Sequence, residues 1–148
     1  MRVTTKGRYA LRALVKLALD GSEKPIPIKR LAEAEEISPE FLEQIFFRLK
    51  KSGIIDSVRG PGGGFVLRMD PEDITTRAIF DAVGEGIELT PCTTPSNNGN
   101  AKECDRAEEC LMHDVWHEVS EHITTYFESL TLRKILDRSR ETTDELLV

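Results

Sequence analysis

Several features that would assign this 148-residue chain to a familiar class are missing from it. It has no run of eighteen apolar residues, so we expect no membrane span. It has only three cysteines, and an odd number cannot form a closed set of disulfides. Free thiols are typical of a reducing compartment, which predicts a cytoplasmic protein. The length fits one domain or two small ones.

Motifs of catalysis are missing as well. The glycine-rich run 60–64 lacks the Lys-Ser/Thr pair of a nucleotide-binding loop, and it does not connect a strand to a helix. No pattern supports a Ser/His/Asp triad. The chain also lacks a Cys-x-x-Cys pair, which a redox dithiol needs and most structural zinc sites contain. We therefore expect a protein that is not an enzyme.

Charge is distributed unevenly along the chain. Residues 1–70 hold 13 Lys and Arg against 9 Asp and Glu, whereas residues 71–148 hold 7 against 17. The net charge is thus +4 in the front part and −10 in the back part, giving −6 overall. A basic front part suits a nucleic-acid surface joined to an acidic regulatory or assembly part. A solvated acidic surface without a partner explains the same numbers equally well.

Apolar periodicity predicts three helices at the N-terminal end: Gly7–Asp20, Ile28–Glu35, and a third that follows the capping residue Ser38 and ends at Gly53. At residues 54–58 and 65–67 the apolar residues no longer follow a helical period, and the pattern is typical of short strands. The glycine-rich turn between them indicates a hairpin. Three helices and a hairpin form a winged helix-turn-helix. The expected fold class is therefore mainly α, with a small β-hairpin wing.

The third helix is the predicted DNA-reading element. Gln44 suits a bidentate pair with adenine, and Arg48 suits a guanine or a phosphate. Glu43 repels phosphate but accepts a hydrogen bond from cytosine, so it would exclude wrong sequences. Arg59, in the hairpin turn, suits a narrow A·T-rich minor groove. The full expected DNA-binding set is Ser38, Pro39, Glu40, Glu43, Gln44, Arg48, Arg59 and Gly60. A plain surface helix of a small helical domain is the alternative.

The last third of the chain is predicted to be helical, after a fourth helix near residues 74–83 and a long loop at residues 84–109. Apolar residues recur there at three- and four-residue steps, as in a helix that has one apolar side. This pattern fits a dimer seam and a core-facing helix about equally well. The residues of the expected seam are Trp116, Val119, Ile123, Tyr126 and Leu130.

A cluster of metal-ligating residue types precedes that helix. Cys92, Cys104, Cys110 and His113 are separated by eleven, five and two residues. Three thiolates and an imidazole suit zinc or an iron–sulfur cluster. Incidental buried thiols are the alternative, but these cysteines lie in a polar stretch containing proline and glycine.

Four segments resemble the IscR-like iron–sulfur cluster regulators, a family of dimeric winged-helix bacterial transcription factors, and the resemblance spans almost the whole chain. These segments are Met1–Ala10, Ile37-Ser38 with Leu42–Phe46, Ser57–Phe65, and Cys110–His113 with Trp116. The resemblance implies that residues 1–70 form the DNA-binding domain and that residues 71–148 hold a cluster-binding loop and dimerisation helices. It implies a repressor or activator that binds a roughly palindromic operator as a homodimer, with RNA polymerase as a further partner when it activates.

The resemblance also implies a [2Fe–2S] cofactor with Cys92, Cys104, Cys110 and His113 as ligands. The family usually has five residues between its first two cysteines, where this chain has eleven. The cost of closing a loop grows slowly with its length, so this insertion is compatible with ligation. Some branches use an acidic residue of the first helix as a ligand, but here arginines stand at positions 8 and 12. A nitric-oxide or redox sensor and a zinc-stabilised interaction module remain alternative functions.

Overall fold

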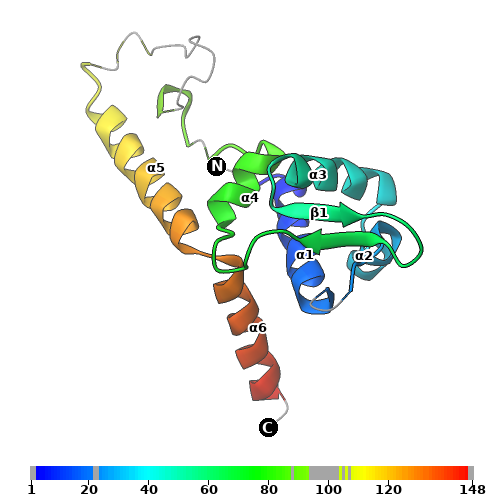
Figure 1. Cartoon of the computed structure of the whole chain (residues 1–148). Helices are drawn as coiled ribbons and strands as arrows, with labels where there is room; N and C mark the ends of the chain where they lie inside the picture. The colour runs from blue at the N-terminus through cyan, green and yellow to red at the C-terminus, as the bar shows by residue number, and fades with distance from the viewer. Residues whose placement is uncertain are drawn as a thin grey trace.

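The computed structural model of the chain describes residues 3–21, 24–87, 89–93, 104, 106 and 108–146. Within these residues the helices are α1 (Thr5–Asp20), α2 (Ile28–Glu35), α3 (Pro39–Lys51), α4 (Thr76–Val83), α5 (Leu111–Ser129) and α6 (Leu132–Leu146). Strands β1 (Ile55–Val58) and β2 (Gly64–Leu67) pair antiparallel, and η1 (Pro91–Thr93) is a single 3-10 turn. The predicted fold class is confirmed (Figure 1).

Capping residues explain where two of these helices begin. The Ser38 side chain accepts a hydrogen bond from the Phe41 amide at 3.2 Å, and Pro39 occupies the first helical position of α3. Thr75 caps α4 in the same way, accepting from the Ala78 amide at 3.0 Å. Because Thr75 is the cap, α4 begins two residues later than the apolar pattern predicts.

Helix α1 lies at the centre of the body, where it contacts α2, α3, α4, α6 and β2. A single cluster of buried apolar side chains joins these elements. The front part of the chain and the helices α4 and α6 all contribute to it, for example through Leu14, Phe46, Ile55, Ile79 and Leu132. Edge-to-face packing of Phe46 on Phe65, with ring centroids 5.0 Å apart, connects α3 to the hairpin.

The hairpin is attached to the body through the segment before α2. Ile26 and Phe65 exchange two backbone hydrogen bonds of 3.0 and 2.9 Å. This contact requires glycine at position 64, because a Cβ there would lie 2.3 Å from the backbone carbon of Ile26. The loop between the strands projects beyond α2 (Figure 1).

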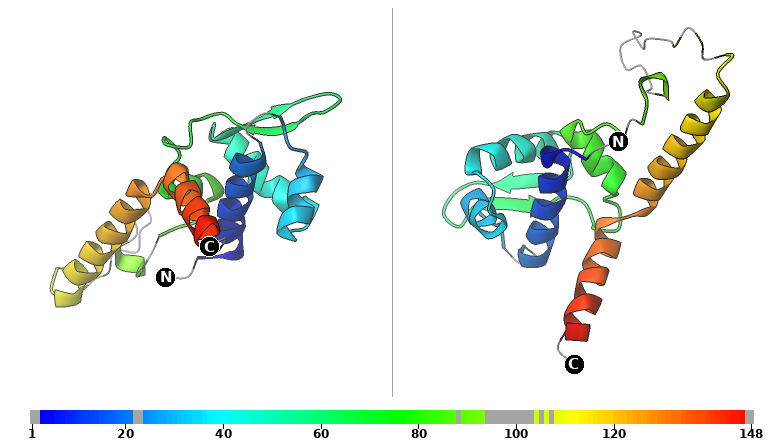
Figure 2. Two further views of the ribbon diagram at one scale, coloured as in Figure 1. Left: turned by 90° about the horizontal axis from the view of Figure 1, so that it is seen from below. Right: turned by 180° about the vertical axis from the view of Figure 1, so that it is seen from behind.

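Helices α5 and α6 extend from the body in opposite directions (Figures 1 and 2). Their junction is fixed to the start of α4, because the Thr76 amide donates to the Leu130 carbonyl at 2.8 Å and the Leu132 amide donates to the Ile74 carbonyl at 2.8 Å. Helix α6 packs on α1 and spans 15 residues, longer than the short final helix that the sequence predicts. Among the described helices, none is both long and apolar enough to cross a bilayer.

Candidate nucleic-acid interface and metal centre

Helix α3 lies along one edge of the body (Figure 1). Its outer face is mainly polar and exposed. Its opposite face supplies the buried side chains Leu42, Ile45, Phe46 and Leu49. The outer face carries the predicted readers Glu40, Glu43, Gln44 and Arg48, all of which are exposed. Such an outer face is accessible to a large ligand without any change in the core.

Basic side chains gather at the C-terminal end of α3. Arg48, Lys50 and Lys51 stand in its last turn, where positive charge also complements the helix dipole. The Lys50 ammonium donates a hydrogen bond to the Ser57 hydroxyl, which ties α3 to β1. Arg48 and Lys51 remain exposed and are therefore available to phosphate oxygens.

The hairpin turn exposes Arg59 and Gly60 to solvent. The Gly63 amide closes the turn by donating to the Gly60 carbonyl at 2.9 Å. Gly60 has a φ of 97°, a conformation that side chains disfavour, and no atom lies within 4 Å of the place where its Cβ would stand. Glycine is therefore required here by the backbone, and the open space around it leaves the turn accessible to a groove of DNA.

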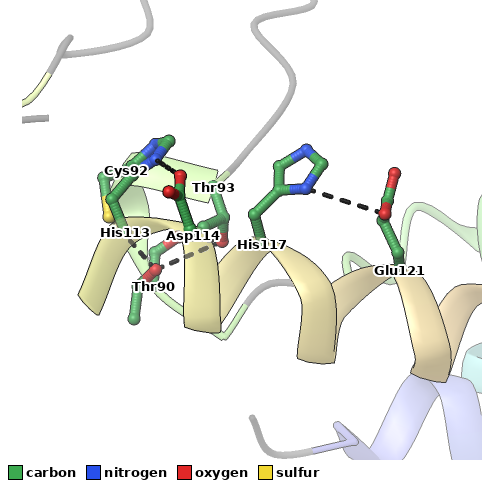
Figure 3. A network of polar contacts seen from close by, with 7 residues as sticks. All are labelled: Thr90, Cys92, Thr93, His113, Asp114, His117 and Glu121. Carbon is green, nitrogen blue, oxygen red and sulfur yellow. Dashed lines mark hydrogen bonds and ion pairs between the residues drawn. The ribbon is translucent and has the colours of Figure 1, made fainter. Parts of the chain in front are cut away.

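Cys92 belongs to η1, which contacts α5. The Thr90 hydroxyl lies 3.3 Å from the Cys92 sulfur, and the Thr93 hydroxyl lies 3.5 Å from the Ser120 hydroxyl of α5. Figure 3 shows Cys92 at the end of α5 that carries His113. These threonines and Ser120 were not predicted from the sequence, since no local pattern indicates that η1 and α5 meet.

The other candidate ligands lie at or before the start of α5. Cys110 is the residue that precedes the first turn, and its carbonyl accepts a hydrogen bond from the His113 amide at 3.0 Å. His113 is half-buried, with its Nδ1 3.5 Å from a carboxylate oxygen of Asp114 (Figure 3). Cys104 and Cys110 are exposed, and all three cysteines are free thiols.

These donors do not form an assembled site. Among the described residues, no three metal-ligating side chains come together as a group. Residues 94–103, most of the insertion between Cys92 and Cys104, lie outside the described residues. His117 is one turn beyond His113 but faces Glu121 instead, with Nδ1 3.8 Å from its carboxylate (Figure 3). Arg8 donates a hydrogen bond to the Thr5 hydroxyl, and Arg12 holds the end of α2 by donating to Glu35.

Helix α5 presents an apolar face that the other described residues leave partly open to solvent. None of its residues, all of which the structure describes, is buried. Of the predicted seam, Trp116 and Val119 are each 38% exposed and Tyr126 is 53% exposed. Ile123 is half-buried, and Leu130 lies just beyond the last helical residue. Phe127 instead packs against Phe80 of α4, so one side of α5 meets the body and another side meets solvent.

A contact that the sequence did not predict joins the start of α1 to the segment after α4. Glu85, only 5% exposed, follows α4 and covers the first turn of α1. Its carboxylate accepts hydrogen bonds from the Thr4 amide at 2.8 Å and from the Thr4 hydroxyl. A Cβ on Gly7 would lie 3.0 Å from this carboxylate, so the small residue makes room for it. No local signal in the sequence connects positions 4 and 85.

The winged helix, its exposed polar helix α3 and its projecting hairpin turn define a DNA-binding transcription regulator. Comparison with known proteins identifies the family. The chain belongs to the Rrf2 family, whose model, described as an iron-dependent transcriptional regulator, matches residues 3–138.

Its relatives include regulators named IscR. It is 39% identical to the HTH-type transcriptional regulator IscR of Serratia proteamaculans (strain 568) over 137 residues, which cover 93% of this chain and 80% of the relative. The solved structure of T. potens IscR is 30% identical with a TM-score of 0.75, covering 96% of this chain and 90% of that one. CymR, the global cysteine regulator of B. subtilis, is 25% identical with a TM-score of 0.73, covering 93% and 98%. The chain is thus an IscR-like transcription regulator and not an enzyme.

Proposed function

We propose that this chain is a sequence-specific regulator that binds a roughly palindromic operator as a homodimer and senses iron–sulfur status through a [2Fe–2S] cluster. The observation that carries its DNA-binding part is the outer face of α3. This face exposes Gln44, Glu43 and Arg48 beside the basic last turn of the helix. These side chains match base edges and phosphates in a major groove, and the Glu43 carboxylate disfavours sequences whose bases cannot donate a hydrogen bond to it.

The proposed cluster ligands are Cys92, Cys104, Cys110 and His113. Their chemistry fits the cofactor, because a [2Fe–2S] cluster takes four protein donors and three of these are thiols free of disulfides. When bound, the cluster would supply a redox centre whose potential is raised by an imidazole ligand relative to four thiolates. Thr93 and Ser120 support the arrangement, because the contact between their hydroxyls brings the Cys92 turn beside α5, and the Thr90 hydroxyl contacts the Cys92 sulfur within that turn.

The proposed dimer rests on the apolar face of α5. A homodimer has two-fold symmetry, so the same face of α5 on each chain would cover the other. Two-fold symmetry presents the α3 helix of each chain to DNA in the same way, so the operator should be roughly palindromic. Such a regulator acts in the cytoplasm as a repressor or, through RNA polymerase, as an activator.

Anaerobic reconstitution tests the cluster. The purified chain, supplied with iron and sulfide, should take up about one [2Fe–2S] unit and absorb visible light, as thiolate-ligated iron does. Cys92→Ser, Cys104→Ser and Cys110→Ser should each abolish that absorption.

Two histidine variants make the matched comparison. His113→Ala should weaken or abolish the visible spectrum, whereas His117→Ala should leave it unchanged because His117 faces Glu121. Stoichiometric zinc without iron uptake would contradict the cluster and favour the zinc-stabilised interaction module. A cluster that resists loss of His113 would mean that the fourth ligand is a different residue.

A further inference from the structure

Phe47 is a large apolar side chain in an unexpected place. It lies on the outer face of α3 and is 70% exposed. The core does not need it, because Phe46 and Leu49 are fully buried on the other side of the helix. It stands three residues after Gln44 and four after Glu43, so all three side chains lie on one helix face.

The surface around Phe47 is polar and charged. Two shallow hollows meet at its ring. One is shared with Glu43, Gln44 and Arg48, and the other is shared with Arg48 and Lys51. Apart from Phe47, the two hollows are lined by carboxylate, amide, cationic and small side chains, namely Glu40, Glu43, Gln44, Arg48, Lys51, Ser52 and Ala82. Arg48 and Lys51 suit phosphate oxygens and Gln44 suits a base edge, so these polar surroundings fit a nucleic-acid surface better than an apolar protein–protein patch.

We propose that Phe47 is a specificity-determining residue that contacts the 5-methyl group of a thymine in the major groove. This inference rests on the proposed function, in which α3 enters that groove. A phenyl ring has no hydrogen-bonding group and therefore cannot read the donors and acceptors of base edges. The thymine methyl is the apolar group that a major groove displays, and phenylalanine is one of the side chains that contacts it. Gln44 and Phe47 would then read neighbouring bases by different chemistry.

The test begins with selection by the full-length protein from a random pool of duplex DNA. Each thymine of the selected sequence is then replaced by deoxyuridine, one position per half-site at a time, which removes only the methyl group. At one position the wild-type protein should lose about fourfold in affinity, the effect of one methyl-sized group leaving an apolar contact. All other replacements should leave affinity unchanged.

The variants assign that effect to Phe47. Phe47→Ala should bind the thymine and deoxyuridine duplexes equally well, and Phe47→Leu should restore part of the difference. Gln44→Ala is the matched control, because it should bind more weakly yet keep the wild-type thymine-to-deoxyuridine ratio. Thermal unfolding should be unaffected by either alanine substitution, since both side chains are exposed.

The outcomes separate this inference from the proposed function. A selected sequence whose affinity depends on no thymine methyl, or a Phe47→Ala protein that keeps the wild-type ratio, would overturn the role of Phe47 and leave DNA recognition intact. Failure of the wild-type protein to select any sequence would overturn both.

Discussion

Helices α3 and α5 carry the same kind of apolar stripe and use it in opposite ways. In α3 the residues Leu42, Ile45, Phe46 and Leu49 recur at three- and four-residue steps, and each is at most 1% exposed. In α5 the stripe that includes Trp116, Val119 and Tyr126 has the same spacing and remains exposed. Periodicity thus reports that a helix has an apolar side, but it does not report whether the partner of that side lies in the same chain.

The difference follows from how each helix is held. The apolar side of helix α3 packs on the body, where the helix contacts α1, α2, α4 and β1. Helix α5 is attached along one side, by η1 at Ser120 and by α4 and the α6 junction towards its C-terminal end. A stripe of large apolar side chains that is open to solvent on another side of the helix indicates an interaction site. The partner that we propose for it is a second copy of the chain.

We expect the largest effect from a charge placed in the exposed stripe of α5. Val119→Glu places a carboxylate in the proposed seam, and two-fold symmetry buries two such charges in each dimer. We expect a monomer by analytical ultracentrifugation and at least a hundredfold loss of affinity for operator DNA. The helical body should remain folded, because Val119 contributes nothing to its buried cluster.

Thr125→Glu is the matched control for this substitution. It adds the same charge to the same helix at an exposed position outside the apolar stripe. It should therefore leave the dimer intact. A Val119→Glu protein that still dimerises would exclude this face of α5 as the seam.

The next effect concerns the buried stripe. Leu42→Ala leaves a cavity under α3 and should reduce the free energy of unfolding by about 2–5 kcal/mol. The loss should be the same, to within about 0.5 kcal/mol, in the Val119→Glu background, because sites that share no partners act additively. Urea unfolding of the four proteins measures this. A loss that shrinks in the monomeric background would mean that the core under α3 depends on dimerisation.

Local signals predicted those parts of the fold that local chemistry determines. The bounds of α2 and the Ser38 cap of α3 agree with the sequence analysis, and so does the hairpin to within one residue per strand. Helix α1 begins two residues early, at Thr5, and a cap supplied from far along the chain is the physical reason. Apolar periodicity cannot detect a contact between residues 4 and 85.

For the candidate site, the sequence indicates residue types but not how they are arranged in space. The cysteines and His113 are predicted ligands because of their chemistry, and the predicted DNA-reading residues of α3 lie opposite its buried stripe. The Thr93–Ser120 contact that joins the Cys92 turn to α5 depends on tertiary packing, which the spacing of residues does not encode. Phe47 is apolar, so the sequence alone does not separate it from the core residues beside it, whereas the structure shows that it is 70% exposed.

The smallest predicted effect comes from Glu85, which follows α4 in the segment that leads to the cysteines. Glu85→Ala removes the carboxylate that accepts hydrogen bonds from the Thr4 amide and hydroxyl, and it leaves these donors partly buried. We expect a loss of about 1–3 kcal/mol in the free energy of unfolding, measured by urea at one fixed protein concentration. Glu33→Ala, an exposed change in α2, is the control and should change stability by less than about 0.5 kcal/mol.

Combining Glu85→Ala with Thr4→Ala should cost less than the sum of the two single changes, because both remove the same contact. Full additivity would mean that the two residues act separately and that Glu85 does not connect α1 to the segment after α4.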